Sequence, residues 1–382
     1  MSTGPHLVRV APTLTPGKNP LVQAAAREYK SPMSVGASPA ISRVEPNRGP
    51  QSRSINGSRG SGRRRVASVQ SLLLTDGRRL SVRRWPGRGD PVVILHGLLD
   101  SSEGWTRLCE RVSIPALAFD LPGFGCSDPS RGSITGYAHD VAEGLALLGV
   151  KRFALVGHSL GGAVAAALAE MMPTQVSSVV LLAPAGFGRI HLAETASIPG
   201  VRNVLQATLP LVLASRFAVT VGFRTMVTNG DRPDRDVVER VISRGGQLVE
   251  GAREGTRAVV HAGRHRDAFH RRRVGYDGPV LAVWGDRDRL VPVSHRHGVK
   301  TAFPQAVIHV WYGMGHHPLS ERFDQLLAVV TNASTAARRP VRRKVAPATT
   351  QEITFRQRPS APARVCPGGH GRLVAQAATS SG

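Results

Sequence analysis

The chain has 382 residues, enough for one large domain or two small ones with a sizeable buried core. It carries 50 Lys and Arg against 26 Asp and Glu, a net charge of +24, with an aromatic content of only 5%. Its three cysteines are scattered and odd in number, which argues against a disulfide framework and favours a reducing, cytoplasmic location.

The positive charge is concentrated at the two ends of the chain. Residues 1–65 hold eleven Arg and Lys against two Glu, and residues 335–382 hold nine against one. Both segments are rich in Ser, Pro, Gly and Ala and have too few apolar side chains to offset the entropy of ordering. We expect a disordered basic extension at each end, able to contact polyanions weakly and non-specifically. The first segment resembles a transit peptide in composition, but the same character at the other end argues against import.

Between these ends, short apolar runs alternate with helical patterns. Residues 71–75 and 80–85 flank Asp76-Gly77, a dipeptide typical of a tight hairpin turn. Apolar runs without polar alternation indicate strands buried on both faces, and therefore a parallel sheet covered by helices. Residues 134–148 and 160–171 have helical length and spacing. The fold class expected is α/β, and the apolar runs cover residues 91–95, 114–119, 153–156, 179–182, 280–284 and 307–311.

One long gap interrupts this alternation between residues 183 and 280. Its length is far beyond an ordinary connection, so we expect an inserted helical cap over residues 187–277, with a separate interaction domain as the alternative. The core is then expected over residues 66–186 and 278–334. Residues 204–223 are the longest apolar stretch, but Pro210 and Arg216 interrupt them, so no transmembrane segment is expected.

The strongest chemical motif is Gly157-His158-Ser159-Leu160-Gly161. It fits the G-x-S-x-G pattern, in which a serine sits on a strained turn between a strand and a helix and flanking glycines avoid a backbone clash. An apolar run precedes the motif and an Ala-rich helical pattern follows it. Ser159 is therefore the predicted nucleophile, because a serine in this context can be activated by a histidine oriented by an acid.

The acid and the base must be sought after later strands. Asp286 and Asp288 both follow the run at residues 280–284, and His316 and His317 both follow the run at residues 307–311. Residue spacing alone leaves both pairs open.

Over residues 66 to about 330 the sequence resembles the α/β-hydrolase family. The resemblance implies that Asp288 in Trp284-Gly285-Asp286-Arg287-Asp288 is the acid and that His316 in Gly315-His316-His317-Pro318 is the base. It also implies an oxyanion loop at His96-Gly97, with the backbone N–H groups of Leu98 and Leu160 as donors. Ser159 stands where dehalogenases and epoxide hydrolases of this fold have Asp, and Leu98-Leu99 replaces the glycine triplet of many lipases.

These features together predict a serine hydrolase that cleaves an ester-type bond of a small hydrophobic substrate through an acyl-enzyme. A C–C bond hydrolase or lactonase of the same fold, or a member that only binds a ligand, is the alternative. No cofactor and no metal are expected. If the apolar stretch at residues 204–223 forms a wall facing the pocket, it would favour acyl or other hydrophobic substrates. The basic run at residues 264–273 is expected either as a rim that attracts anionic substrates or as a solvated helix face.

Overall fold

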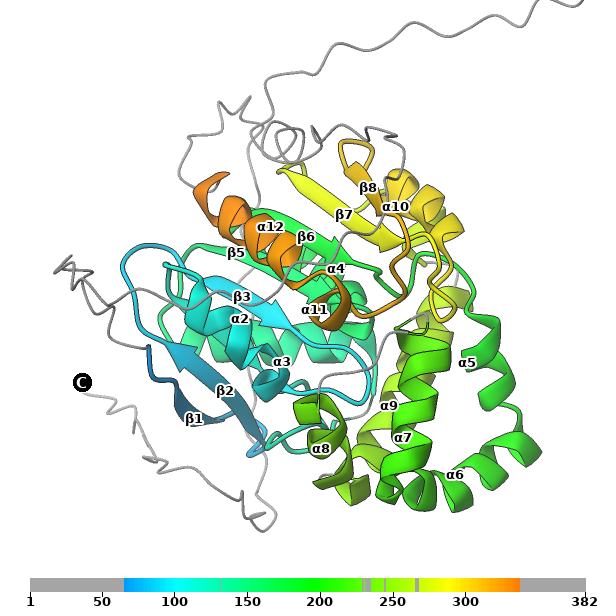
Figure 1. The fold of residues 1–382 in the computed structure, drawn as a ribbon. Helices are drawn as coiled ribbons and strands as arrows, with labels where there is room; N and C mark the ends of the chain where they lie inside the picture. Colours follow the sequence, from blue (N-terminus) through cyan, green and yellow to red (C-terminus); the bar gives the residue numbers. More distant parts are fainter. Residues whose placement is uncertain are drawn as a thin grey trace, which may run out of the picture. The chain divides into compact units, whose positions relative to one another are not determined.

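The computed structural model describes residues 65–336, apart from residues 131, 229, 231–234, 244 and 265–267. In this part of the chain eight strands form one sheet in the order β1-β2-β4-β3-β5-β6-β7-β8 (Figure 1). The strands from β3 to β8 run parallel to one another, and β2 runs opposite to them, pairing antiparallel with both β1 and β4. The α/β architecture expected from the sequence is confirmed. The strands are β1 (Ser68–Leu73), β2 (Arg79–Trp85), β3 (Val92–Leu95), β4 (Ala116–Phe119), β5 (Phe153–His158), β6 (Val176–Leu182), β7 (Val280–Gly285) and β8 (Val307–Trp311).

Every residue of the central strands β3 to β7 is buried. This explains why their sequences are continuous apolar runs. Strand β6 begins at Val176, three residues before the apolar run that predicted it, because its second and third residues are serines. The Ser177 hydroxyl donates to the Phe153 carbonyl at 2.7 Å, and the Ser178 hydroxyl donates to the Ala333 carbonyl at 2.9 Å, so both polar groups are satisfied inside the core.

Helices cover both faces of the sheet. On one side α4 (Leu160–Met171) packs on β3, β5 and β6, and α3 (Ile134–Leu147) packs on β2 and α4. On the other side α12 (Phe323–Ala336) packs on β5 and β6, beside α2 (Thr106–Arg111) (Figure 1). The remaining short segments of the core are η1 (Ser102–Trp105), η3 (Phe269–Arg271), η4 (Val293–His295), α10 (Arg296–Ala302) and α11 (Pro318–Glu321).

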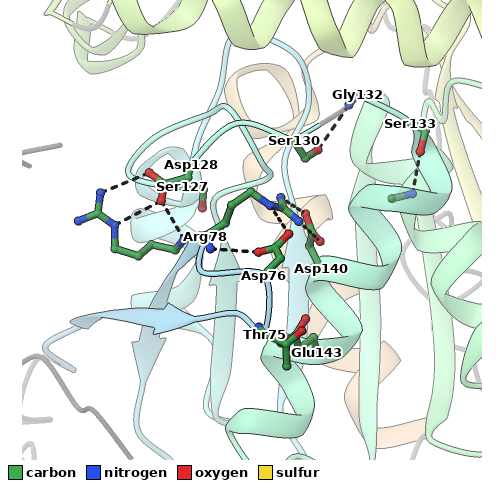
Figure 2. Close-up of polar contacts among 12 residues, drawn as sticks. Thr75, Asp76, Arg78, Ser127, Asp128, Ser130, Gly132, Ser133, Asp140 and Glu143 are labelled. Atoms are coloured by element: carbon green, nitrogen blue, oxygen red, sulfur yellow. Dashed lines mark hydrogen bonds and ion pairs between the residues drawn. The ribbon is translucent and has the colours of Figure 1, made fainter. Parts of the chain in front are cut away.

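The β1–β2 hairpin is fastened to α3 by an ionic network around its turn (Figure 2). The Arg78 guanidinium donates to both oxygens of Asp140 in α3, at 2.6 and 2.7 Å, and to Asp76 in the turn at 2.6 Å. The Thr75 N–H donates to Glu143, one helical turn further along α3, at 2.6 Å. These contacts hold the antiparallel edge of the sheet in register with the helix beneath it.

Five helices and a π-helical segment occupy most of the gap between β6 and β7. They pack partly among themselves and partly on the core, since α9 contacts both α3 and α4. Most of the large side chains of the apolar stretch at residues 204–223 are exposed, so this stretch does not form a buried apolar wall. The elements are α5 (His191–Ala196), α6 (Pro199–Ala214), α7 (Arg216–Gly222), η2 (Phe223–Val227), α8 (Arg235–Ser243) and α9 (Gly245–Arg264).

The basic run beyond α9 is not a solvated helix face in its described part, which is a single short turn, η3. Arg272 is bound to both oxygens of Glu170 in α4, and Arg273 is paired with Asp277 at 2.6 Å. These carboxylates neutralise two of the arginines expected to attract an anionic substrate. The structure therefore does not support a basic rim that attracts anionic substrates.

Three further expectations concern the ends of the chain, membrane-spanning helices and the cysteines. Of the two basic ends expected at residues 1–65 and 335–382, residues 1–64 and 337–382 lie outside the described residues, and residues 335–336 are the end of α12. Within the described residues no single helix is long and apolar enough to span a membrane. Only α6 and the segment Arg216–Val227 taken together have that length and composition, and they are bent by 108° relative to each other. Cys109 is buried and is not part of a disulfide.

Candidate active site

Ser159 lies at the sharp junction between β5 and α4. Its backbone has φ 52° and ψ −115°, a conformation that costs a non-glycine residue on the order of 1–3 kcal/mol. A Cβ at Gly157 would collide with the carbonyl of Gly161, and a Cβ at Gly161 would collide with the carbonyl of Leu95. The glycines of the motif are therefore required because three stretches of backbone meet around the serine.

Backbone strain is gathered at the carboxyl end of the sheet. Among the described residues, the non-glycine positions with positive φ are Leu99, Ser159 and Ala183, which follow β3, β5 and β6 respectively. The three strands are neighbours in the sheet. The Ser159 carbonyl also accepts from the Ala185 N–H at 2.9 Å, which ties the junction to the loop after β6. Strain of this kind is characteristic of functional sites, where the surrounding structure enforces it.

Asp288 and His316 form a buried pair after β7 and β8. The His316 Nδ1 donates to Asp288 Oδ2 at 2.7 Å, and the two side chains are only 6% and 0% exposed. The other carboxylate oxygen, Oδ1, accepts from the N–H groups of Leu290 and Val291 at 2.9 and 2.8 Å. The carboxylate is thus held in one orientation by backbone donors, and this leaves the Nε2 of His316 available for another proton.

The two alternatives left open by spacing have other partners. Asp286 is exposed and accepts from the Gly313 N–H at 2.7 Å, which closes the loop after β8. His317 Nδ1 is hydrogen-bonded to the Ser320 hydroxyl at 2.9 Å. Of these four side chains the structure brings together Asp288 and His316.

The backbone around His316 is fixed from several sides. Glu321 accepts from the Gly315 N–H at 2.7 Å and from the His317 N–H at 3.0 Å, so its carboxylate brackets the histidine. The His316 N–H donates to the Val227 carbonyl of η2 at 2.6 Å. The inserted helices are thereby connected directly to the loop that carries His316.

His158 is a site residue that sequence reasoning missed. Its Nε2 donates to the His316 carbonyl at 2.9 Å, and the two rings lie 4.9 Å apart. Since His158 precedes Ser159 in the chain, this contact places the His316 loop beside the serine junction. Burial lowers the pKa of His158 well below its ordinary value of 6.5, and the neighbouring charges of His316 and His317 lower it further. Its only sequence signal was its place as the variable residue before the serine.

The loop after β3 presents a backbone N–H to the same region. His96, which is fully buried, accepts from the Leu121 N–H through Nε2 at 2.9 Å, so its Nδ1 carries the proton and donates to the Gly97 carbonyl at 2.7 Å. In a trans peptide the C=O and N–H point in opposite directions, so the Leu98 N–H is turned away from His96. A Cβ at Gly97 would lie 3.2 Å from the Ser159 Cβ, which places this loop against the serine.

The second expected donor, Leu160, is the first residue of α4. The first N–H groups of a helix have no partner within it. Among the hydrogen bonds of the described residues, neither the Leu98 N–H nor the Leu160 N–H has an acceptor. Both groups can therefore receive an oxyanion next to Ser159. The described residues contain no group of three or more side chains suited to hold a metal ion.

Comparison with known proteins agrees with this architecture. A family model described as alpha/beta hydrolase fold matches residues 90–218, which include Ser159. An uncharacterized protein of Mycobacterium tuberculosis is 30% identical over 251 residues, covering 62% of this chain and 73% of the relative. A 2-hydroxy-6-oxo-6-phenylhexa-2,4-dienoate hydrolase of Comamonas testosteroni is 24% identical over 254 residues, covering 63% of this chain and 85% of the relative.

Among solved structures, the esterase RhEst1 of a Rhodococcus species superposes with a TM-score of 0.52 at 23% identity, covering 69% of this chain and 97% of the esterase. That likeness concerns the fold, whereas the family match and the mycobacterial relative rest on the sequence itself. Because the sheet order, the strained serine junction and these matches all agree, the chain belongs to the alpha/beta hydrolase fold family.

Proposed function

We propose that this hydrolase-fold protein cleaves an ester-type bond through an acyl-enzyme on Ser159. The observation that carries the proposal is the buried Asp288–His316 pair, whose loop is hydrogen-bonded to the residue next to Ser159. A serine hydroxyl becomes a useful nucleophile when a base removes its proton, and that base needs a third group to fix its tautomer.

The roles follow from the atoms that each group presents. Asp288 accepts from Nδ1–H of His316, so the lone pair is on Nε2, and Nε2 takes the Ser159 proton as Oγ attacks the carbonyl carbon. The negative charge that develops on the carbonyl oxygen is received by the N–H groups of Leu98 and Leu160, and losing one such donor typically costs about 3 kcal/mol. His316 then protonates the leaving alcohol. Water, activated by the same histidine, hydrolyses the acyl-enzyme.

C–C bond hydrolysis is the second candidate. It is favoured by the relative from Comamonas testosteroni, whose name states a dienoate hydrolase. It is also favoured by the stretch Pro184-Ala185-Gly186 after β6, in which Ala185 donates its N–H to the Ser159 carbonyl. In that reaction the leaving group is a carbanion in place of an alkoxide, and His316 delivers the proton to carbon.

The test compares the full-length protein and Ser159→Ala on a panel of chromogenic esters of increasing acyl length, together with a ring-fission dienoate. We expect turnover of at least one ester by the wild-type protein and none above background by the variant. Turnover of the dienoate alone identifies the second candidate. No turnover of either class, with direct binding of an ester in a calorimeter, identifies a member that only binds.

A further inference from the structure

The outer surface of the inserted helices is unusually apolar. Within the part of the chain that the structure describes, fourteen large hydrophobic residues are exposed, and ten of them lie in the segment from Leu192 to Met226. The most exposed of these ten are Val204, Leu211 and Phe217, at 63%, 72% and 80%. A monomeric protein in water seldom presents so many neighbouring apolar side chains, and such surfaces mark sites of interaction.

The helical periodicity shows that α6 has two apolar faces. Leu209 and Leu213 are four residues apart and pack on the hydrophobic core. Val204, Leu205, Leu211 and Val212 recur at the spacing of another face, and all are exposed. A surface helix of a water-soluble protein normally has polar residues on that second face. On α6 that face is apolar, so contact with an apolar environment would remove it from water.

The charge of the segment selects what that environment is. Residues 195–228 contain Arg202, Arg216 and Arg224 and not one Asp or Glu. Arg216, although exposed, is ion-paired with Glu239 of α8, whereas Arg224 is exposed and pairs with no carboxylate in the described residues. An apolar helix face combined with arginines and no acids is the composition of helices that lie in the interface of anionic membranes. In a second copy of the same face the arginines would meet like charge. The 108° bend between α6 and the segment Arg216–Val227 suits a pair of helices lying along a surface.

The same segment leads to the candidate active site. α7 continues directly into η2, where the Val227 carbonyl accepts from the His316 N–H and the Phe223 ring lies 6.1 Å from the His317 ring. Figure 1 shows α6 at the end of the insertion that is away from the sheet, and α7 beside α9. A surface that contacted α6 and α7 would therefore be joined to the histidine loop by a single short element.

We infer that α6 and α7 form a docking face for membrane surfaces that contain anionic phospholipid. The exposed side chains Val204, Leu211 and Phe217 enter the interface between headgroups and acyl chains, and Arg224 contacts phosphate groups. This inference is independent of the proposed catalysis, because binding to a bilayer requires no turnover.

The test measures flotation of the full-length protein with vesicles of phosphatidylcholine, with and without phosphatidylglycerol, at low and high salt. The key variant is the triple substitution Val204→Gln, Leu211→Gln and Phe217→Gln. It preserves net charge, so the basic ends of the chain contribute equally to both proteins. The matched control is Leu73→Gln with Leu147→Gln, two exposed apolar residues outside the insertion, at 63% and 48%.

We expect the wild-type and control proteins to bind phosphatidylglycerol vesicles and to retain part of that binding at high salt. The triple variant should bind on the order of a hundredfold more weakly at high salt. Equal binding by the triple variant and the wild type would overturn the inference, as would a wild-type protein that does not bind. A dimer in light scattering that the triple variant dissociates would also overturn it, in favour of a second copy.

A second readout locates the contact itself. In a Phe217→Trp variant, the indole should be quenched by phospholipids brominated in their acyl chains and should shift its emission to the blue on binding. Vesicle binding without such quenching would overturn the inference. The Ser159→Ala protein should bind vesicles like the wild type, so a failure of the docking face and a failure of the proposed hydrolysis give different results.

Discussion

Two aspartates only two residues apart have different tasks. Asp288 is buried against His316 and two backbone N–H groups, whereas Asp286 is exposed and closes a turn by accepting from the Gly313 N–H. Sequence spacing could not separate them, because both follow β7 on the same loop. Family resemblance chose Asp288, and the structure gives the physical difference between them.

The substitution Asp288→Asn should therefore lower kcat/KM for an ester on the order of 10⁴-fold. The amide favours the wrong imidazole tautomer and does not stabilise the imidazolium that forms during the reaction. Asp286→Asn is the matched control and should keep activity close to the wild type. Steady-state kinetics of both variants decide between them, and a larger loss in Asp286→Asn would reverse the assignment.

The sequence did not indicate a role for Glu321, because this residue acts on the backbone of the loop that carries His316. Its two oxygens accept from the N–H groups on either side of His316. We expect Glu321→Ala to lower kcat about 10- to 100-fold with little change in KM, since a shift of about 1 Å in a catalytic group can cost that much. Glu321→Gln, which keeps one acceptor oxygen, should lie between the alanine variant and the wild type. Identical kinetics for all three proteins would contradict this role.

At the scale of elements, the sequence predicted each strand of the sheet but not all of their ends. Strands β3 to β7 are buried on both faces, so their apolar runs are unambiguous, and the glycines around Ser159 identified the β5–α4 junction. The inserted helices were harder to predict. The apolar outer face of α6 has the pattern of a buried helix, and nothing local shows that it points outward. Contacts such as that from Val227 to His316 join segments about ninety residues apart and have no sequence signature.

The hairpin network in Figure 2 gives a stability prediction. Asp140→Ala removes the bidentate partner of Arg78, whose side chain is 27% exposed, and leaves its charge half-buried without that carboxylate. A hydrogen bond to a charged group is worth about 1.5–3 kcal/mol, and the loss in free energy of unfolding should lie in that range. Asp76→Ala, at a side chain 46% exposed, should cost less than about 1 kcal/mol. Urea unfolding measures both, and a costlier Asp76 variant would contradict the account.

For the whole molecule, buried histidines predict sensitivity to acid. Burial lowers the pKa of His158, His295 and His309 below the ordinary value of 6.5. Below pH 6.5 these histidines bind protons in the unfolded chain but not in the folded protein. The free energy of unfolding should therefore fall as the pH falls from 6.5 toward the lowered pKa values of the folded protein. His309→Gln removes one of these groups and should show a smaller fall between pH 7 and pH 5. Thermal unfolding across that range tests the prediction, and stability that rose on acidification would refute it.

The central claim is that Ser159 is the nucleophile, and covalent labelling tests it most directly. A fluorophosphonate reacts with a serine only where a base and an oxyanion site activate it. We expect the wild-type protein to take up one label, which mass spectrometry should find on the peptide containing Ser159, and we expect neither Ser159→Ala nor His316→Ala to be labelled. A label on any other serine, or equal labelling of Ser159→Ala, would contradict the account.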